Sequence, residues 1–148
     1  MAGPPRFCFS PRRSTMVMRT YIPLLGRILL GLIFVMSGIN KITGFEGTQQ
    51  YMASKGMPAT AILLVGAIIM EVLGGLSVIL GYRGRLGAAA LVLFLIPATL
   101  IFHTNFAEQT QMIMFLKNLS IMGGLLLVVA HGTGPYSITE QPKEAVRT

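Results

Sequence analysis

A long apolar segment at residues 59–80 reads ATAILLVGAIIMEVLGGLSVIL and contains one ionisable side chain, Glu71. At a rise of about 1.5 Å per residue, a helix of this length reaches about 30 Å and can cross the hydrocarbon core of a bilayer. A carboxylate at that depth is costly unless it faces protein or water, and such residues often serve function. Gly74 and Gly75 follow one turn later and leave room for another helix. The segment therefore predicts a transmembrane helix with a polar site at Glu71.

The composition places the whole chain in the membrane class. Of its 148 residues, 53% are hydrophobic and 11% are charged, whereas soluble domains carry about 25% charged residues. The net charge of +7 does not indicate a nucleic-acid partner, because the cations lie between apolar segments, where membrane orientation explains them. The single cysteine, Cys8, excludes a disulfide or a thiolate metal site within one chain.

Three further apolar segments predict helices that complete an all-α bundle of four transmembrane helices. They cover residues 22–39, 86–102 and 112–130. Residues 42–58 are expected to form the first loop, the glycine-rich sequence GYRGRLG the second, and TNFAEQTQ the third. The expected membrane domain covers residues 19–138.

The two ends of the chain are expected to be tails. Residues 1–18 are rich in Pro, Arg and Ser, and they are either a disordered tail or the product of a start assigned too far upstream. A mitochondrial transit peptide shares this composition, but the prolines disfavour the amphipathic helix that it needs. The pair Arg12–Arg13 matches a twin-arginine signal only weakly, since no small-residue cleavage site follows. Residues 139–148 form a polar C-terminal tail.

The distribution of cations predicts the orientation of the bundle. With four spans, both tails and the second loop lie on one side of the membrane, which the positive-inside rule identifies as cytoplasmic. The opposite side carries Lys41 and Lys55 in the first loop and no cation in the third loop. The cations of the predicted cytoplasmic side are Arg6, Arg12, Arg13, Arg19, Arg83, Arg85, Lys143 and Arg147.

A first candidate site pairs Glu71 with Arg27. Arg27 lies about one turn inside the cytoplasmic face, and Glu71 roughly two and a half turns from the same face. The difference in depth is on the order of 5 to 7 Å, which an arginine side chain can cover. We therefore hypothesise a buried Arg27–Glu71 ion pair. In the alternative, Glu71 is neutral and bonded to backbone, and Arg27 reaches the headgroups.

A second candidate site lies near the outer face. Its side chains are hydrogen-bond donors that could hold a quinone oxygen or a partner's carboxylate. The alternative is that they simply reach for the membrane surface. The members of this predicted outer pocket are Lys41, His103, Lys117 and Asn118.

Haem, iron–sulfur clusters and other metals are not expected. His103 and His131 end successive helices of opposite direction and so lie on opposite faces, roughly 25 Å apart. One iron cannot bind both, and a chain without a cysteine pair cannot hold an iron–sulfur cluster by itself. No catalytic residue or metal ligand is predicted.

The polar residues and glycines also follow an ordered set of motifs. The series R-x3-G-x6-G-x2-K covers residues 27–41, and E-x2-GG-x5-G covers residues 71–81. Arg85, His103, Lys117–Asn118, Gly123–Gly124 and G-x-G-x2-S at residues 132–137 come after. Over residues 24–138, this order resembles the DoxX family of small four-helix bacterial membrane proteins. The resemblance implies the bacterial cytoplasmic membrane and an association with terminal-oxidase, thiosulfate:quinone oxidoreductase and other membrane redox complexes.

Two classes of function follow. The first is an accessory subunit of a quinone-linked redox assembly, inactive as an enzyme by itself, with an oxidoreductase or a second copy of the chain as partner in the bilayer. Its one expected small-molecule ligand is a quinone. The second class is a binding or transport module that moves a small solute or a proton through the Arg27 and Glu71 region.

Overall fold

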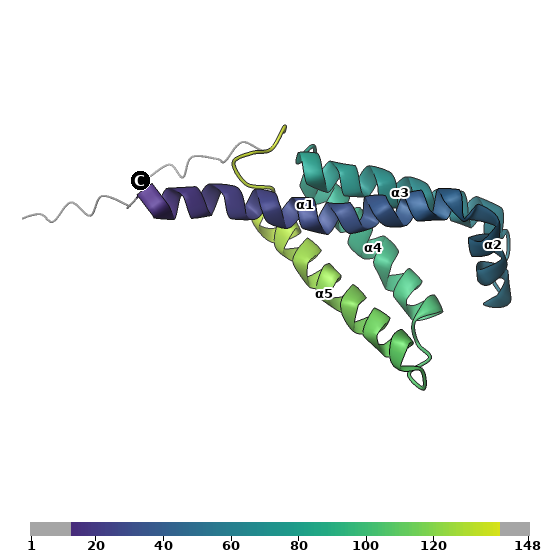
Figure 1. Cartoon of the computed structure of the whole chain (residues 1–148). Helices are drawn as coiled ribbons and strands as arrows, with labels where there is room; N and C mark the ends of the chain where they lie inside the picture. The colour runs from purple at the N-terminus through teal and green to yellow at the C-terminus, as the bar shows by residue number, and fades with distance from the viewer. Residues whose placement is uncertain (1–12, 140–148) are drawn as a thin grey trace, which may run out of the picture.

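The computed structural model describes residues 13–139 and contains five helices and no strand over that range. They are α1 (Arg13–Thr43), α2 (Phe45–Ser54), α3 (Thr60–Leu80), α4 (Gly84–Phe102) and α5 (Gln109–His131) (Figure 1). All except α2 are long and apolar enough to cross a membrane. The predicted all-α bundle with four transmembrane helices is therefore confirmed.

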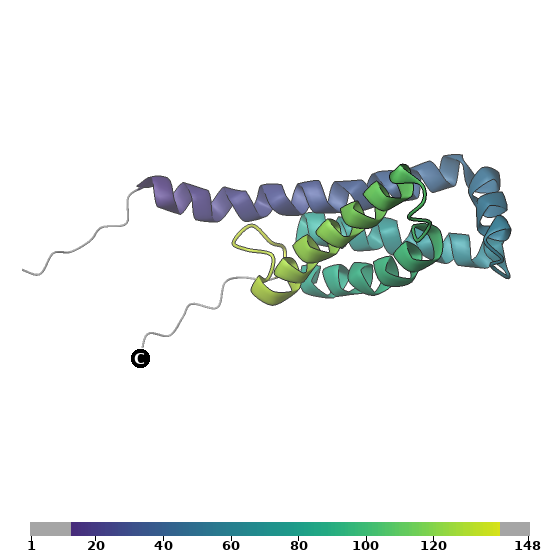
Figure 2. The ribbon, with the colours of Figure 1, turned by 90° about the horizontal axis from the view of Figure 1, so that it is seen from below.

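Two boundaries differ from the prediction. The first helix begins at Arg13, so residues 13–18 of the expected tail are helical, while residues 1–12 and 140–148 of the tails lie outside the described part. The expected first loop contains α2, a helix of 10 residues that is too short to span a bilayer. It lies across one end of the bundle (Figures 1 and 2).

The four long helices pack against one another in the order in which they follow along the chain. The most extensive contacts join α1 to α3, α3 to α4 and α4 to α5, whereas α1 touches α5 only slightly. The four long helices converge where α3 turns into α4. At the opposite end, which carries α2, α4 and α5 diverge from α1 and α3 (Figure 1). We call these two ends the turn end and the α2 end.

Glycines set the register of α1 against α3. A Cβ added at Gly31 would lie 2.6 Å from the carbonyl oxygen of Gly75, and one added at Gly75 would lie 2.8 Å from the carbonyl oxygen of Gly31. Further along α1, a Cβ at Gly38 would lie 2.6 Å from Val72 Cγ2. Because no real Cβ fits at such distances, only glycine lets the two backbones touch here. Gly31 therefore lies opposite Gly75.

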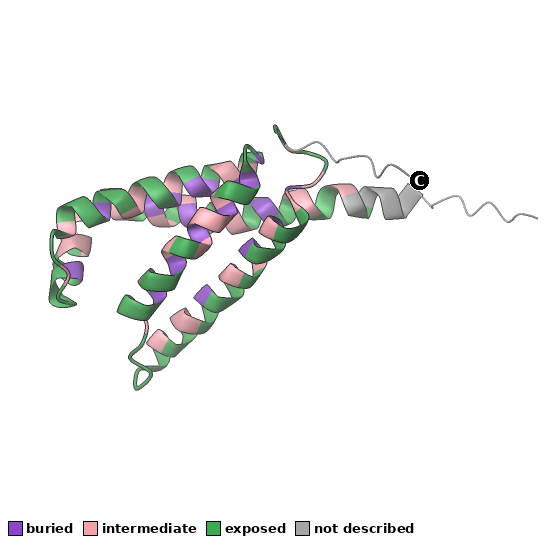
Figure 3. Ribbon diagram, turned by 180° about the vertical axis from the view of Figure 1, so that it is seen from behind, coloured by how far each residue is buried: buried purple, intermediate pink, exposed green. Residues whose placement is uncertain are grey.

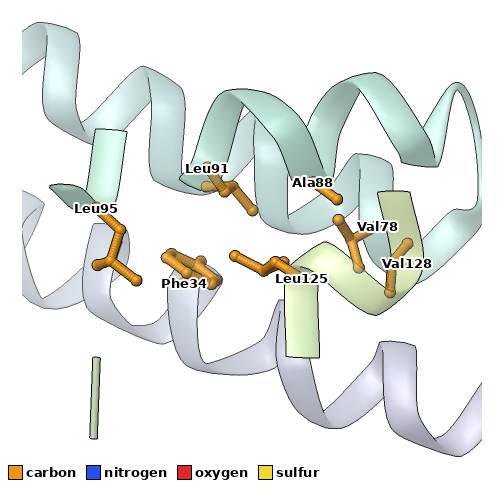
Figure 4. Close-up of a cluster of buried hydrophobic side chains, with 7 residues drawn as sticks. All are labelled: Phe34, Val78, Ala88, Leu91, Leu95, Leu125 and Val128. Carbon is orange, nitrogen blue, oxygen red and sulfur yellow. The ribbon is translucent and has the colours of Figure 1, made fainter. Parts of the chain in front are cut away.

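The buried apolar core joins all four long helices, and many other apolar residues are exposed (Figure 3). Outward-facing residues such as Ile62, which is 75% exposed, form the surface that a bilayer covers. The core side chains are Phe34, Val78, Ala88, Leu91, Leu95, Leu125 and Val128 (Figure 4).

Residues 132–139 return to the turn end after α5. The amide of Ile138 donates to the carbonyl of Leu80 at 3.3 Å, and the rings of Tyr21 and Tyr136 lie 5.6 Å apart. The first and last described segments thus both lie on the side of the turn end. A chain that crosses the membrane four times must begin and end on the same side. The side of the membrane that this end faces stays a prediction.

Candidate functional site

A cavity of about 520 Å³ lies at the α2 end, where the helices spread apart, and all five helices contribute to its wall. This volume falls within the range of about 300 to 1,000 Å³ that small-molecule sites occupy. The wall is mostly apolar, with a few polar side chains among aromatic and aliphatic ones. Those polar residues are Ser37, Lys41, Thr48, Tyr51, Glu71, His103, Lys117 and Asn118.

An ion pair between Lys41 and Glu71 forms part of this wall. Lys41 Nζ lies 2.9 Å from each oxygen of the Glu71 carboxylate and donates to Ser37 Oγ at 2.7 Å. Ser37 in turn donates to Glu71 Oε1 at 3.3 Å. The side chain of Glu71 is 7% exposed and that of Lys41 26%. The Glu71 carboxylate is therefore largely removed from solvent, while the Lys41 side chain stays partly exposed and lines the cavity.

The hypothesis of an Arg27–Glu71 pair is wrong. The buried Arg27 side chain lies at the turn end, where it donates to the carbonyl oxygen of Tyr136 and lies beside Gly81. Gly81 follows Glu71 by ten residues, which is about 15 Å along a helix.

The direction of helical side chains explains the choice of partner. Side chains lean toward the N-terminus of their own helix, and α1 begins at the turn end. Arg27 therefore leans away from Glu71, whereas Lys41 leans back one turn toward Ser37 and reaches the carboxylate. The Arg27–Glu71 prediction used only the depth of each residue, counted along the sequence. It took no account of side-chain direction or of the register between α1 and α3.

The structure brings the four predicted outer-pocket residues together on the wall of this one cavity. His103 Nδ1 lies 2.8 Å from Gln111 Oε1 at the start of α5. The buried Asn118 side chain donates to Thr99 Oγ1 at 3.0 Å. Lys117 is exposed, and its Nζ lies 3.1 Å from Met114 Sδ. The pocket also takes in Glu71, which the sequence had grouped with Arg27.

Helix α2 covers the cavity, whereas residues 42–58 were expected to form only a loop. Thr48, Tyr51 and Met52 line the wall, and the ring of Tyr51 stacks on Phe102 of α4 with centroids 5.6 Å apart. The spacing of Phe45, Thr48 and Met52 places these inward side chains on one helix face. That spacing was the available signal for a helix in the expected loop.

The two histidines lie at opposite ends, because His103 follows α4 at the α2 end and His131 closes α5 at the turn end. Within residues 13–139, no three His, Cys, Asp or Glu side chains gather closely enough to hold a metal ion. The expected absence of haem and iron–sulfur clusters stays a prediction.

The chain matches a known protein family and is similar to two inner membrane proteins. Residues 22–104 match the DoxX family. The chain is 44% identical to Inner membrane protein YqjF and 36% identical to Inner membrane protein YphA, both of Escherichia coli (strain K12). These alignments cover 78% and 81% of this chain, and 87% and 89% of the relatives.

A more distant relative is "Putative oxidoreductase CatD" of Bacillus subtilis (strain 168), which is 37% identical over 51% of this chain and 54% of its own length. No solved structure matches. The inner-membrane relatives and the four apolar helices agree on the location: the chain is a multi-pass protein of the bacterial inner membrane.

Proposed function

Because the chain belongs to the DoxX family, we propose that it is an accessory subunit of a quinone-linked redox assembly in the inner membrane. Its cavity at the α2 end holds the lipid-soluble quinone, and a partner oxidoreductase carries the electrons. The chain contributes the binding site and the membrane anchor.

The cavity is the observation that carries this proposal. A quinone joins an apolar body to ring carbonyl oxygens, which accept hydrogen bonds but cannot donate them. The cavity presents the matching pattern, since an apolar wall surrounds nitrogen donors from Lys41, Lys117 and Asn118. The cavity lies at one end of four helices that are long and apolar enough to cross a membrane, so a quinone dissolved in the bilayer would meet it without leaving the membrane.

The residues of the chain favour an accessory role over independent catalysis. The sequence has one cysteine, in its N-terminal tail, so no thiol pair within one chain can exchange electrons. Its two histidines lie at opposite ends of the bundle and cannot share one haem iron. The oxidoreductase in the name of one relative supports the redox context.

The test is purification from native membranes in mild detergent, followed by mass spectrometry of the proteins and lipids that remain bound. We expect a quinone and an oxidoreductase in the wild-type preparation. Lys117→Ala and His103→Ala should reduce the quinone retained, while Lys55→Ala, at the same end but outside the cavity wall, should not. Quinone turnover by the isolated chain would contradict the accessory role. Absence of both quinone and oxidoreductase would contradict the proposal as a whole.

The Lys41–Glu71 pair favours one other function, the binding or transport of a small solute or a proton. A carboxylate at membrane depth beside a cavity is a common feature of proton paths. Arg27 does not belong to this path, since it lies at the turn end. Flux across vesicles that disappears in Glu71→Gln, with no quinone retained, would favour this function.

A further inference from the structure

We propose that the Lys41–Glu71 pair makes the cavity selective for ligands with uncharged heads. This inference rests on the proposed function, because it concerns the ligand that the same cavity holds. The feature that determines specificity is a pair of opposite charges in the cavity wall that neutralise each other.

The positions of the charges support this selectivity. Lys41 and Glu71 are in contact and their charges cancel, and the carboxylate is nearly fully covered by protein. An anionic head brought to Lys41 would also meet Glu71, and a cationic head brought to Glu71 would meet Lys41. In the low dielectric of a membrane protein, a third charge at this place stays uncompensated. Lys117 also lines the cavity and carries a positive charge, but its side chain is exposed, so its charge is screened more than the charges of the buried pair.

The pair can still bind an uncharged head. The three donors of Lys41 Nζ reach Ser37 Oγ and both carboxylate oxygens of Glu71. A neutral carbonyl oxygen can replace one carboxylate oxygen as acceptor while Nζ keeps its contact with the other, so the ion pair stays together. Asn118, bonded to Thr99 through its amide nitrogen, adds a second neutral polar group to the wall.

The apolar part of the wall determines that the ligand has a hydrophobic tail. Phe34, Leu64 and Leu95 are buried side chains that line the cavity from α1, α3 and α4. They offer an apolar surface next to the pair, so the ligand class is a lipophilic molecule with a neutral head that accepts hydrogen bonds. Long-chain acids and amines are excluded, although they share the same apolar tail.

The test uses three probes with one ten-carbon tail and different heads: decylbenzoquinone, decanoate and decylammonium. Their affinities for the full-length protein in lipid nanodiscs are measured by calorimetry at neutral pH. We expect the wild type to bind the quinone at least about tenfold more tightly than either charged probe. This factor of ten corresponds to about 1.4 kcal/mol at 25 °C.

Variants of the pair should shift the preference in opposite directions. Glu71→Gln leaves the Lys41 charge uncompensated and should raise the affinity for decanoate relative to the quinone. Lys41→Met leaves the Glu71 charge and should raise the relative affinity for decylammonium. Glu46→Gln changes a carboxylate outside the cavity wall and should leave the ranking unchanged.

Several outcomes would overturn the inference. They are equal binding of the three probes by the wild type, no binding of any probe, or the same direction of change in Glu71→Gln and Lys41→Met. The wild-type comparison decides even where a single variant fails to fold. Selective binding without a copurifying oxidoreductase would support the inferred selectivity and contradict the redox assembly. A copurifying oxidoreductase together with unselective binding would support the assembly and contradict the selectivity.

Discussion

The two ends of the bundle differ in how closely their helices approach. At the turn end, Gly31 and Gly75 bring two backbones into contact, and residues 81–83 join α3 to α4 directly. At the α2 end, the connections are longer, over residues 44–59 and 103–108, and the helices spread around a cavity. The closed end thus has a short connection and a direct backbone contact, and the open end has longer connections.

This difference separates stability from binding along the length of the molecule. The contact between Gly31 and Gly75 belongs to the closed end and most of the polar cavity wall to the open end, while Phe34 and Leu95 of the apolar core also line the cavity. Changes at the turn end should lower the amount of folded protein. Changes to Lys117 and His103 in the polar part of the cavity wall should mainly alter what the protein binds.

The largest expected effect concerns the ion pair that joins α1 to α3 at the open end. Glu71→Gln or Lys41→Met should each lower the free energy of unfolding by about 3–5 kcal/mol, because each leaves a mostly buried charge without its partner. The double variant should recover much of the loss, as denaturant titration in detergent can measure. Losses that simply add would show that the two residues are not coupled.

A smaller effect is expected from the glycine contact at the closed end. Gly75→Ala places a methyl group against the backbone of α1 and should cost about 1–3 kcal/mol of unfolding free energy. Gly66→Ala is the matched control on the same helix, since nothing lies within 4 Å of a Cβ there. It should be neutral or slightly stabilising. Equal losses in the two variants would contradict the close packing.

The stacking of α2 on α4 should contribute less. Tyr51→Leu removes the ring contact with Phe102 and should cost about 0.5–1.5 kcal/mol. Tyr82→Leu changes an exposed tyrosine at the turn end and provides the control. A double-mutant cycle with Phe102→Leu measures the coupling, and a coupling energy of zero would mean that the stack does not hold α2 over the cavity.

Reporter fusions can measure the orientation of the bundle. Reporter fusions after Tyr51, Gly84, Glu108 and Glu140 should read outside, inside, outside and inside, because the cations gather on the side of the two tails. This result would place the turn end in the cytoplasm and the open end on the outer side. An inside signal from the Glu108 fusion would reverse that assignment.

The sequence predicted the four spans because each one repeats a simple physical requirement, about twenty apolar residues for one bilayer. It also placed Lys41, His103, Lys117 and Asn118 at one depth, because that depends only on their distance from helix ends. The structure gathers these four on one cavity wall, although their function stays a prediction.

The partner of Glu71 could not be obtained in the same way. It depends on which glycines of α1 and α3 meet and on the direction in which Lys41 and Arg27 lean, and neither follows from hydropathy. Helix α2 was missed for a different reason. Its ten residues are polar on their outer face, so no long apolar run marked it.

The most direct test of the central claim, that the open end holds the ligand, is photolabelling with an azido-quinone followed by peptide mapping. We predict labels on the cavity wall, within residues 33–41, 48–57, 63–71, 94–103 and 117–121. An excess of unlabelled quinone should remove these labels. Labelling centred on the turn end, around Arg27 and residues 132–139, or labelling that unlabelled quinone does not reduce, would contradict the claim.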